Sequence, residues 1–231
     1  MNIKHNGNTV KSYTIWRGAS YFGYPTGEGS PYYTAIKKGG YWWSPVNCGA
    51  TRVARPNDGK NGTIAGTGNI YQWGRADYTN HGGSIASGPI SNSRPNDHVF
   101  YEAPDNPYNW LNTQNNTLWN GSNKGINDPC PKGYRVPTID ELKSIGNANS
   151  WDSNGGLFKV NAERDYPQLV LPAAGCRNRV DGLSLNQGTS GGCWSSSVYN
   201  TDANFMEFKN ENAGFRPDFR ARGYSVRCIR E

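Results

Sequence analysis

Only one segment of this chain carries the signals of an α-helix. Thr138 is followed three residues later by Glu141, the capping-box pattern in which each side chain satisfies a backbone amide at a helix start. Gly146 supplies a stop signal. The apolar residues between them form a narrow stripe at helical spacing: Ile139, Leu142 and Ile145. A chain of 231 residues with one short helix must build its core from strands and ordered loops.

The remaining apolar segments are short and rich in residues that suit pleated sheets. Four of them read as strands, with the last two expected at sheet centres: 69–73, 134–136, 169–171 and 224–229. Only 35% of the residues are hydrophobic, but 13% are aromatic and 29 are glycine, which favours short strands joined by ordered turns. The aromatic content argues against disorder, because disordered chains lack the side chains that build a core.

The segment 204–208 alternates in a way that predicts which side chains face inward. Period-2 alternation places Met206 and Phe208 toward the core, and Phe205 and Glu207 toward solvent. A bulge in this strand would break that register.

The stretch 84–127 is dominated by Asn, Pro, Ser and Gly but carries large aromatic residues. These aromatics predict that the stretch is an ordered loop segment packed against the rest of the domain: Tyr101, Tyr108, Trp110 and Trp119. No linker or internal repeat divides the chain, so we expect one domain over 1–231, with residues 1–40 as an N-terminal extension.

Charge and hydropathy exclude several classes of function. The net charge is +6, but Lys37-Lys38 is the only adjacent basic pair, so no phosphate-tracking patch for nucleic acid is expected. No segment approaches the ~20 apolar residues that span a bilayer, so no membrane insertion is expected. Residues 1–20 have no apolar run of signal-peptide type. Either a leader was removed, or the protein leaves its cell by another route, as a phage structural protein released by lysis would.

The five cysteines do not form a metal-binding or redox motif. None of them lies in a C-x-x-C arrangement, which argues against a zinc knuckle or a thioredoxin-like site. An odd count leaves at least one free thiol if the others pair. The sequence leaves the pairing open among Cys48, Cys130, Cys176, Cys193 and Cys228.

The C-terminal forty residues combine two frame-like ends with a diverse middle. Residues 191–197 and 222–230 are rich in glycine, aromatic and small residues. The segment 198–221 between them mixes aromatics, amides and both signs of charge. Such a mixture suits a recognition surface, since aromatics give contact area and amides give adaptable hydrogen bonds. We therefore expect 191–231 to be the ligand-binding segment.

Five phrases of the sequence, taken together and in this order, resemble the FISUMP ("major paralogous domain") family of bacterial surface proteins. They are Tyr-Gln-Trp-Gly-Arg at 71–75, the phrase from Asn127 to Thr138, Leu-Pro-Ala-Ala-Gly at 171–175, Trp-Ser-Ser-Ser at 194–197 and Ser-Val-Arg-Cys at 225–228. The resemblance covers about residues 40–231. It implies an α+β, C-type lectin-like fold of the formylglycine-generating-enzyme-like branch, with a small twisted antiparallel sheet, few helices and long ordered loops.

The C-terminal segment also resembles the variable proteins of diversity-generating retroelements, which carry a rewritten segment on a C-type lectin fold. That resemblance implies a non-catalytic adhesin or phage receptor-binding protein whose partner is a host or environmental cell-surface protein or glycan. It implies a fixed scaffold that includes Trp194, Met206 and Cys228. We predict these ligand-binding residues: Tyr199, Asn200, Asp202, Asn204, Phe205, Glu207, Arg216, Asp218, Phe219, Arg220 and Arg222.

Two alternative functions stay open from the sequence. One is a FISUMP-type surface or carbohydrate-associated domain without diversification. The other is an oxidase-like enzyme of the formylglycine-generating branch, whose chemistry needs a reactive cysteine pair. Cys176 and Cys193 are the candidates for such a pair, although two free thiols or an incidental disulfide suit them better.

Metal chemistry has little support in the sequence. His98 follows Asp97, and a hydrogen bond within a loop is favoured over a pair of metal ligands. The acidic and amide triplets of calcium-dependent sugar-binding lectins are absent, so we expect no metal and no cofactor, with a structural cation left open.

Overall fold

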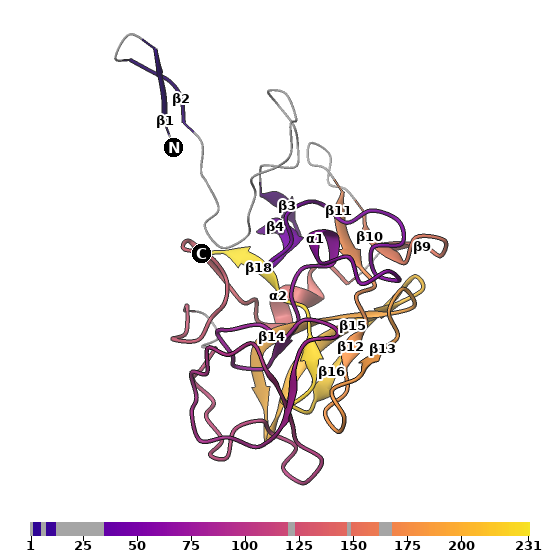
Figure 1. Ribbon diagram of the computed structural model, residues 1–231. Helices are drawn as coiled ribbons and strands as arrows, with labels where there is room; N and C mark the ends of the chain where they lie inside the picture. Colours follow the sequence, from indigo (N-terminus) through magenta and orange to yellow (C-terminus); the bar gives the residue numbers. More distant parts are fainter. Residues whose placement is uncertain (1, 6–7, 13–34, 120–122, 147–148, 162–167) are drawn as a thin grey trace.

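The computed structural model describes residues 2–5, 8–12, 35–119, 123–146, 149–161 and 168–231. In this part of the chain the protein is mostly β, with several small antiparallel sheets, one parallel strand pair and two short helices, α1 (Ile64–Thr67) and α2 (Ile139–Lys143) (Figure 1). The expectation of small antiparallel sheets with few helices is thus confirmed, although the described part is mostly β and has less helix than the expected α+β class implies.

Two four-stranded antiparallel sheets hold the C-terminal strands at interior positions. The first has the order β3-β4-β18-β8, with β3 at Ile36–Lys38, β4 at Tyr41–Asn47, β18 at Arg227–Arg230 and β8 at Tyr134–Arg135. The second has the order β13-β12-β17-β5, with β13 at Ser184–Leu185, β12 at Cys176–Arg177, β17 at Gly223–Tyr224 and β5 at Tyr71–Gln72.

Two three-stranded sheets and two strand pairs complete the described structure. The larger sheet is β14 (Gly191–Tyr199), β15 (Asp202–Lys209) and β16 (Asn212–Asp218), in that order. The other is β11 (Leu169–Pro172), β10 (Leu157–Val160) and β9 (Asn149–Asp152). The pairs are β1 (Asn2–His5) with β2 (Asn8–Ser12), and β6 (Ile85–Ser87) parallel to β7 (Phe100–Glu102).

The predicted helix is present and begins as its sequence indicates. Thr138 is the N-cap, and both halves of the capping box with Glu141 are formed. Leu142 and Ile145 are fully buried, while Ile139 is half-buried. The helix itself ends at Lys143, and turn hydrogen bonds continue to Gly146.

The four predicted strands are also present, but 169–171, expected at a sheet centre, is the edge strand β11, which pairs with β10 alone among the described strands. The last predicted strand serves three sheets. Residues 224–229 divide into β17 and β18, which lie in different sheets. Between them, Ser225 exchanges backbone hydrogen bonds with β14: its N–H donates to the Gly192 carbonyl at 3.2 Å, and its carbonyl accepts from Trp194 at 3.0 Å. The C-terminal segment therefore ties the sheets to one another, which explains why it is buried almost throughout.

The N-terminal boundary of the domain lies earlier than residue 40. Strand β3 pairs with β4 through Ile36 opposite Trp43 and Lys38 opposite Tyr41, so residues 36–38 belong to a sheet of the domain. Residues 1, 6–7 and 13–34 of the expected extension lie outside the described residues.

Strand β15 is buried on both faces around Phe205, which corrects one prediction. Met206 and Phe208 face a core shared with Leu142 and Phe158, as expected. Phe205, expected outward, is 0% exposed and packs on the opposite face, where its ring stacks on Tyr224 at 4.4 Å. The prediction of an exposed Phe205 is wrong because a second core layer covers that end of the sheet.

The phrases that carry the family resemblance meet at the centre of this second layer. The indole N–H of Trp73 donates to the Ser195 carbonyl at 2.9 Å, and that of Trp194 donates to the Tyr71 carbonyl at 2.9 Å. The backbone N–H of Ser196 donates to the Pro137 carbonyl at 2.7 Å. These residues are adjacent in space despite their distance in sequence, and Ser195–Ser197 form an irregularity in the pairing of β14 with β15.

Two buried tryptophans anchor the loop-rich segment 84–127, within the residues that the structure describes. Trp110 and Trp119 are fully buried. The Trp110 indole donates to the Trp73 carbonyl at 2.7 Å, and the Trp119 indole donates to the Asn127 carbonyl at 2.9 Å. Each buried indole thereby satisfies its N–H while its ring anchors a loop.

One disulfide bond is present, between Cys130 and Cys228. It joins the phrase before β8 to the last strand, across 98 residues of sequence. Cys48, Cys176 and Cys193 are free and buried, so Cys176 and Cys193 do not form a disulfide with each other. No helix within the described residues is long and apolar enough to cross a membrane.

The start of helix α2 makes stability depend on pH. Burial opposes ionisation of Glu141, but hydrogen bonds from Arg135 at 2.7 and 2.5 Å and from the Thr138 amide outweigh it and lower the pKa of this carboxyl. A lowered pKa stabilises the fold above the ordinary value of 4.5, and this contribution is lost as the pH falls through the folded-state value. We expect the urea concentration at the unfolding midpoint to decrease as the pH is lowered through that range. In Glu141→Gln this decrease should be smaller than in the wild-type protein.

The matched control is the exposed neighbour Asp140, whose Asp140→Asn variant should keep most of the acid dependence. Equal pH profiles for Glu141→Gln and the wild-type protein would contradict this account.

Candidate functional site

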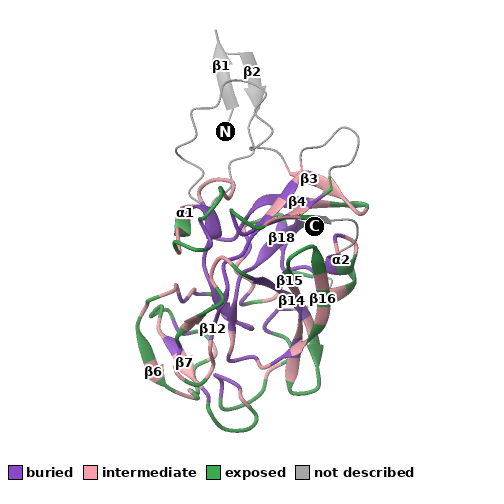
Figure 2. Cartoon of the chain, turned by 90° about the vertical axis from the view of Figure 1, so that its right-hand side faces the viewer, coloured by how far each residue is buried: buried purple, intermediate pink, exposed green. Residues whose placement is uncertain are grey.

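The sheet β14-β15-β16 has one face on the core and a second face that is partly open to solvent. Strand β16 is its outer strand, and alternate residues along it are exposed (Figure 2). On the open side, Arg216 lies opposite Phe205, and Gly214 lies opposite Glu207. We call this surface the C-terminal face and define it by Glu207, Gly214, Arg216, Asp218 and Arg222.

The outer part of the C-terminal face is charged and loosely held. Arg216 and Glu207 form an ion pair at 3.0 Å, with side chains 52% and 41% exposed, and the guanidinium lies 4.9 Å from the Phe205 ring. An ion pair this exposed contributes little to stability. A side chain built at Gly214 would meet no atom within 4 Å. These positions can therefore change without disturbing the core.

The inner part of the C-terminal face is a buried polar floor. The Tyr224 hydroxyl donates to Asp218 at 2.7 Å, and Arg222 lies 3.4 Å from the other oxygen of that carboxylate. Burial and the neighbouring Asp218 hold the pKa of Tyr224 well above its ordinary value, so the hydroxyl stays a donor. Arg222 also approaches the Cys176 sulfur at 3.9 Å. This floor fixes the position of Arg222, whose side chain is partly exposed.

Phe219 extends the face with an aromatic and cationic cluster. Its ring meets Tyr108 edge-on at 4.5 Å, and the Arg179 guanidinium lies 3.9 Å from Tyr108 and 4.8 Å from Phe219. All three side chains are half-buried. Sequence reasoning missed Tyr108 and Arg179 as site residues, because both lie far from the C-terminal segment and no local pattern marks them.

The turn between β14 and β15 presents the other predicted residues at the far end of the sheet. Tyr199 is 53% exposed, and Asn200 occupies the left-handed region with φ 52°, which asparagine tolerates. Asp202 and Asn204 are half-buried, and the Asn204 amide donates to the Val198 carbonyl at 3.4 Å. The structure thus divides the predicted residues between the C-terminal face and this hairpin end, except Phe205, which is fully buried in the core and cannot meet a ligand in this arrangement.

Arg220 is a supporting residue beneath the hairpin end. Its side chain is almost fully buried and lies over the Trp73 ring at 4.4 Å. It donates to the carbonyls of Asp202 at 3.2 Å and Asn115 at 3.2 Å, and to the Asn116 amide oxygen at 2.7 Å. Burial lowers its pKa to about 10, so it stays charged at neutral pH. Arg220 therefore fixes the turn against a neighbouring loop, without offering a free charge to solvent.

A polar groove of about 440 Å³ opens next to the hairpin end. The Gln114 amide in its wall donates to the Asn200 carbonyl at 3.0 Å, which joins the groove to the turn. Its lining is almost entirely hydroxyl and amide: Ser91, Ser93, Leu111, Thr113, Gln114, Asn115 and Asn116. Such a lining suits a ligand that offers many hydroxyl groups.

The two cysteines considered for catalysis lie in separate core clusters. Cys176 belongs to the cluster around Trp194, and Cys193 to the cluster around Phe208. Burial raises the pKa of Cys193 to about 12 and also raises the pKa of Cys176. Because the thiolate is the nucleophile, neither thiol is activated at neutral pH.

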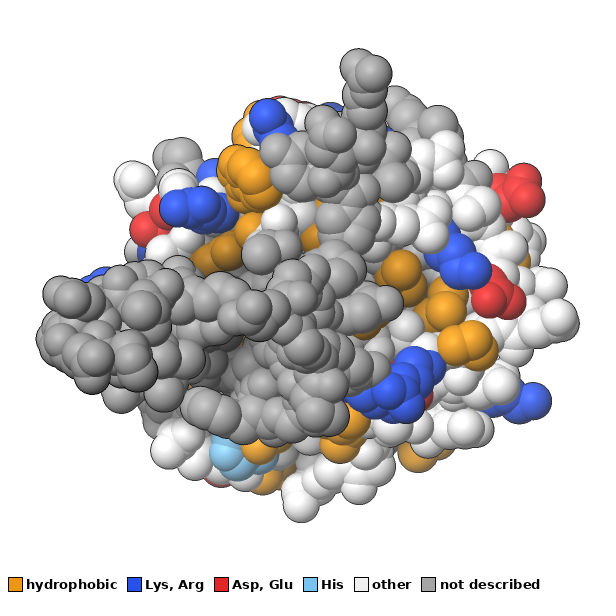
Figure 3. Space-filling view, turned by 90° about the horizontal axis from the view of Figure 1, so that it is seen from above, with side chains coloured by type: hydrophobic (Ala, Val, Ile, Leu, Met, Phe, Trp, Pro, Cys, Tyr) orange, Lys and Arg blue, Asp and Glu red, His pale blue; other side chains and the backbone are white. Residues whose placement is uncertain are grey.

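Metal ligation has no cluster to support it in the described part of the chain. No group of three or more His, Cys, Asp or Glu side chains gathers there. The loop interpretation of His98 is confirmed: its backbone donates to Asp77 at 3.1 Å, and Asp97 bonds Arg75 and Tyr101. In the view of Figure 3, the lysine and arginine side chains that grey atoms do not cover are scattered over the surface.

A scan against protein-family models found no matching family, and searches of curated proteins and of solved structures found no match.

The division between supporting and exposed residues leads to a test at the hairpin end. We expect Arg220→Ala to lower the free energy of unfolding by about 2–3 kcal/mol, because it leaves several buried carbonyls without donors. Tyr199→Ala should change it by no more than about 0.5 kcal/mol, as for most exposed substitutions. Urea denaturation of both variants measures the difference, and equal losses would contradict the assignment of Arg220 as a support.

Proposed function

We propose that this chain is a non-catalytic ligand-recognition protein with a C-type lectin-like fold. Its C-terminal face binds a protein or glycan on the surface of a host or environmental cell. The observation that carries the proposal is the position of Glu207, Gly214 and Arg216. All three lie on strands whose other face is packed core, and all three reach solvent.

The composition of the C-terminal face suits recognition. Arginine and aromatic residues dominate the binding energy of protein interfaces, and here Arg216, Phe219 and Tyr108 are held at the surface by contacts beneath or beside them. Pre-organised side chains lose less entropy on binding. The buried floor of Asp218 and Tyr224 supplies that organisation.

The same arrangement supports a face that can be diversified, as in retroelement variable proteins. Exposed positions such as Tyr199 and Gly214 have space around them, whereas Trp194 and Phe205 are locked in the core. The phrases that resemble the FISUMP family meet around that core, which supports the lectin-like fold as the scaffold.

Display outside a cell, on a bacterial surface or a phage tail, is the proposed location. The Cys130–Cys228 disulfide supports it, because such bonds persist in oxidising surroundings and are rare in the cytosol.

A FISUMP-type domain that binds carbohydrate without diversification is the second candidate. The groove lined by hydroxyl and amide side chains favours it, since sugars are bound through such groups. Loss of glycan binding on Thr113→Val or Gln114→Leu, with Arg216 variants unaffected, would select this candidate over the first.

Charge reversal on the C-terminal face tests the first candidate. Fluorescently labelled protein is applied to a glycan array and to a panel of bacterial cells, and binding is quantified by fluorescence and flow cytometry. We expect Arg216→Glu to reduce binding at least about tenfold, because it repels Glu207 and removes a contact cation. The matched control is Lys132→Glu, an exposed charge in the turn before β8. Equal binding by wild type, Arg216→Glu and Lys132→Glu would contradict the proposal.

A further inference from the structure

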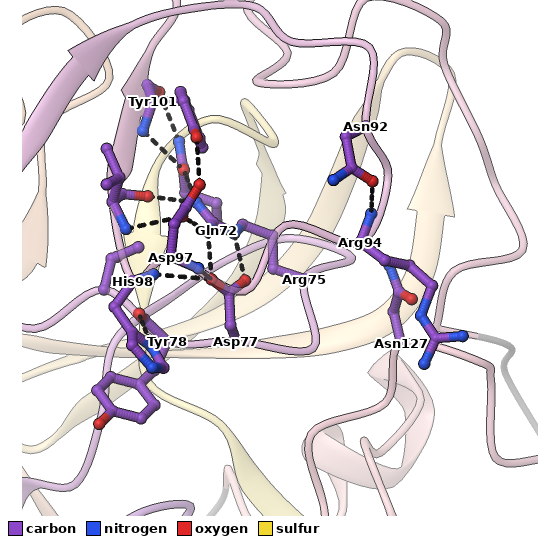
Figure 4. A network of polar contacts seen from close by, with 12 residues as sticks. Gln72, Arg75, Asp77, Tyr78, Asn92, Arg94, Asp97, His98, Tyr101 and Asn127 are labelled. Carbon is purple, nitrogen blue, oxygen red and sulfur yellow. Dashed lines mark hydrogen bonds and ion pairs between the residues drawn. The ribbon is translucent and has the colours of Figure 1, made fainter.

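A second cavity, of about 300 Å³, lies between two loop segments that the recognition proposal does not use. Residues 76–78 form one side and residues 94–98 the other. Its lining combines an arginine, two aromatic rings, an amide and a carboxylate: Ala76, Asp77, Tyr78, Arg94, Pro95, Asn96 and His98. Figure 4 labels Asp77, Tyr78, Arg94 and His98 among them. The contacts around it show which of these groups are free to meet a ligand.

The carboxylate in the wall is already neutralised. Asp77 accepts two hydrogen bonds from the fully buried Arg75, at 2.8 and 2.6 Å, and further bonds from the backbone amides of Asp97 and His98. Asp97 turns away toward Tyr101, as Figure 4 shows, and bonds its hydroxyl at 2.5 Å. Arg75 balances only one of the two carboxylates, so the cluster keeps one negative charge, which lies on Asp97 on the side that faces Tyr101.

The aromatic wall is built with a strained backbone. His98 has φ 57°, a left-handed conformation that costs a residue with a side chain and that is common at functional sites. Two contacts with Tyr78 hold the ring: stacking at 4.3 Å and a hydrogen bond of 3.3 Å from Nδ1 to the Tyr78 carbonyl. A carbonyl only accepts, so Nδ1 carries the hydrogen in this bond, and in the neutral ring Nε2 is then the acceptor. The exposed ring thus offers a flat apolar surface and one acceptor.

Arg94 lines the other side of the cavity, and in Figure 4 its guanidinium points away from His98, so this side chain has to turn inward to meet a ligand there. It is exposed, and its guanidinium has no ion-pair partner among the residues that the structure describes. Its backbone N–H is fixed by the Asn92 amide oxygen at 2.9 Å, as Figure 4 shows. A guanidinium is a planar fork that binds a carboxylate through two parallel hydrogen bonds.

We infer that this cavity binds a sugar ring that carries a carboxylate, such as a terminal uronic or sialic acid. The ring stacks on His98 backed by Tyr78, the carboxylate pairs with Arg94, and the Asn96 amide bonds a hydroxyl. The cavity has room for one such ring and is partly open to solvent, which suits the end of a longer glycan. This site is distinct from the C-terminal face, and its test does not depend on the proposed function.

Saturation-transfer NMR and calorimetric titration test the inference with three defined probes. They are methyl β-D-glucuronide, the methyl glycoside of N-acetylneuraminic acid, and the neutral methyl β-D-glucoside, each titrated to about 10 mM because single sugar rings bind in the millimolar range. We expect at least one acidic probe to bind. The neutral glucoside should bind at least about tenfold more weakly than the glucuronide, since it lacks the group that pairs with Arg94.

Two substitutions at the site and one outside it serve as variants. Arg94→Gln removes the charge of an exposed side chain, and His98→Asn removes the ring while keeping a residue that tolerates the left-handed backbone. Each substitution should lower the affinity for the acidic probe at least about tenfold. Unchanged thermal unfolding of the variant serves as the folding control. Arg216→Gln, on the C-terminal face, should bind the probe like the wild-type protein.

Three outcomes would overturn the inference. They are no binding of either acidic sugar, equal binding of the neutral glucoside and the glucuronide, and unchanged affinity in both site variants. If Arg216→Gln lowered the affinity for the acidic sugar and Arg94→Gln did not, the binding site would be assigned to the C-terminal face. That result would support the proposed function while it removes this second site.

Discussion

Trp194→Ala should lower the free energy of unfolding by about 3–5 kcal/mol, the range found when a buried aromatic side chain is truncated in a core. Trp194 is fully buried, and its ring meets Tyr224 edge-on at 5.0 Å and Phe205 at 5.8 Å. Its indole N–H also satisfies the Tyr71 carbonyl at 2.9 Å. The substitution therefore opens a cavity and leaves a buried acceptor without a donor. Urea denaturation monitored by circular dichroism gives the loss directly.

Trp194→Phe separates the two causes of this loss. It keeps most of the aromatic volume but removes the donor to Tyr71, so its effect should lie between those of wild type and Trp194→Ala. A loss below about 1 kcal/mol for Trp194→Ala, the mean for all substitutions, would show that Trp194 is not the anchor of this sheet.

Removal of the disulfide in a Cys130→Ala/Cys228→Ala double variant should be the second large effect. The bond joins residues 98 apart, and the chain-entropy account gives about 4–5 kcal/mol for a loop of that size. Measured losses of native disulfides run from about 2 to 5 kcal/mol. We therefore expect the unfolding midpoint in urea to fall sharply in the double variant.

Reduction and a free-thiol control check this result independently. Dithiothreitol should lower the midpoint of the wild-type protein toward that of the double variant and leave the double variant unchanged. Cys193→Ala removes a buried thiol that forms no cross-link, so its effect should be smaller and insensitive to reductant. Peptide mass spectrometry without reduction should recover the Cys130–Cys228 pair. A different pairing, or a midpoint insensitive to reductant, would contradict the structure.

Local chemistry explains which parts of this fold were predictable. The helix start at Thr138 depends on residues within one turn, so its capping box could be recognised from four consecutive positions. The strands over 134–136 and 169–171 were recognised from their own composition, because β-branched and aromatic residues suit pleated surfaces wherever they pair.

Long-range contacts explain what could not be predicted. A prediction from period-2 alternation assumes that one face of the strand is exposed to solvent. Around Phe205, both faces of β15 pack against core residues. Arg220 looks like a free charge in sequence, but its partners are backbone carbonyls brought by a loop around Asn115. The disulfide partner of Cys228 lies 98 residues away, and spacing alone does not select it from five cysteines.

The candidate site was predictable as a segment and not residue by residue. The mixture of aromatic, amide and charged residues in 198–221 pointed to this surface. Glu207 and Arg216 are indeed exposed there, but whether they bind a ligand stays a prediction. Tyr108 and Arg179 join the surface from other loops, and only the folded structure brings them to Phe219.

The central claim is that exposed residues of the C-terminal sheet can change freely and determine binding, while a fixed frame holds the fold. A pair of yeast-display libraries tests it most directly, one randomised at Tyr199, Glu207, Gly214 and Arg216, the other at Trp194, Phe205, Met206 and Arg220. Each is sorted for protease resistance and for binding to hen lysozyme as an arbitrary target. We predict that the surface library stays largely resistant and yields lysozyme binders, while most of the frame library is cleaved. Equal cleavage of the two libraries, or a resistant surface library without binders, would contradict the claim.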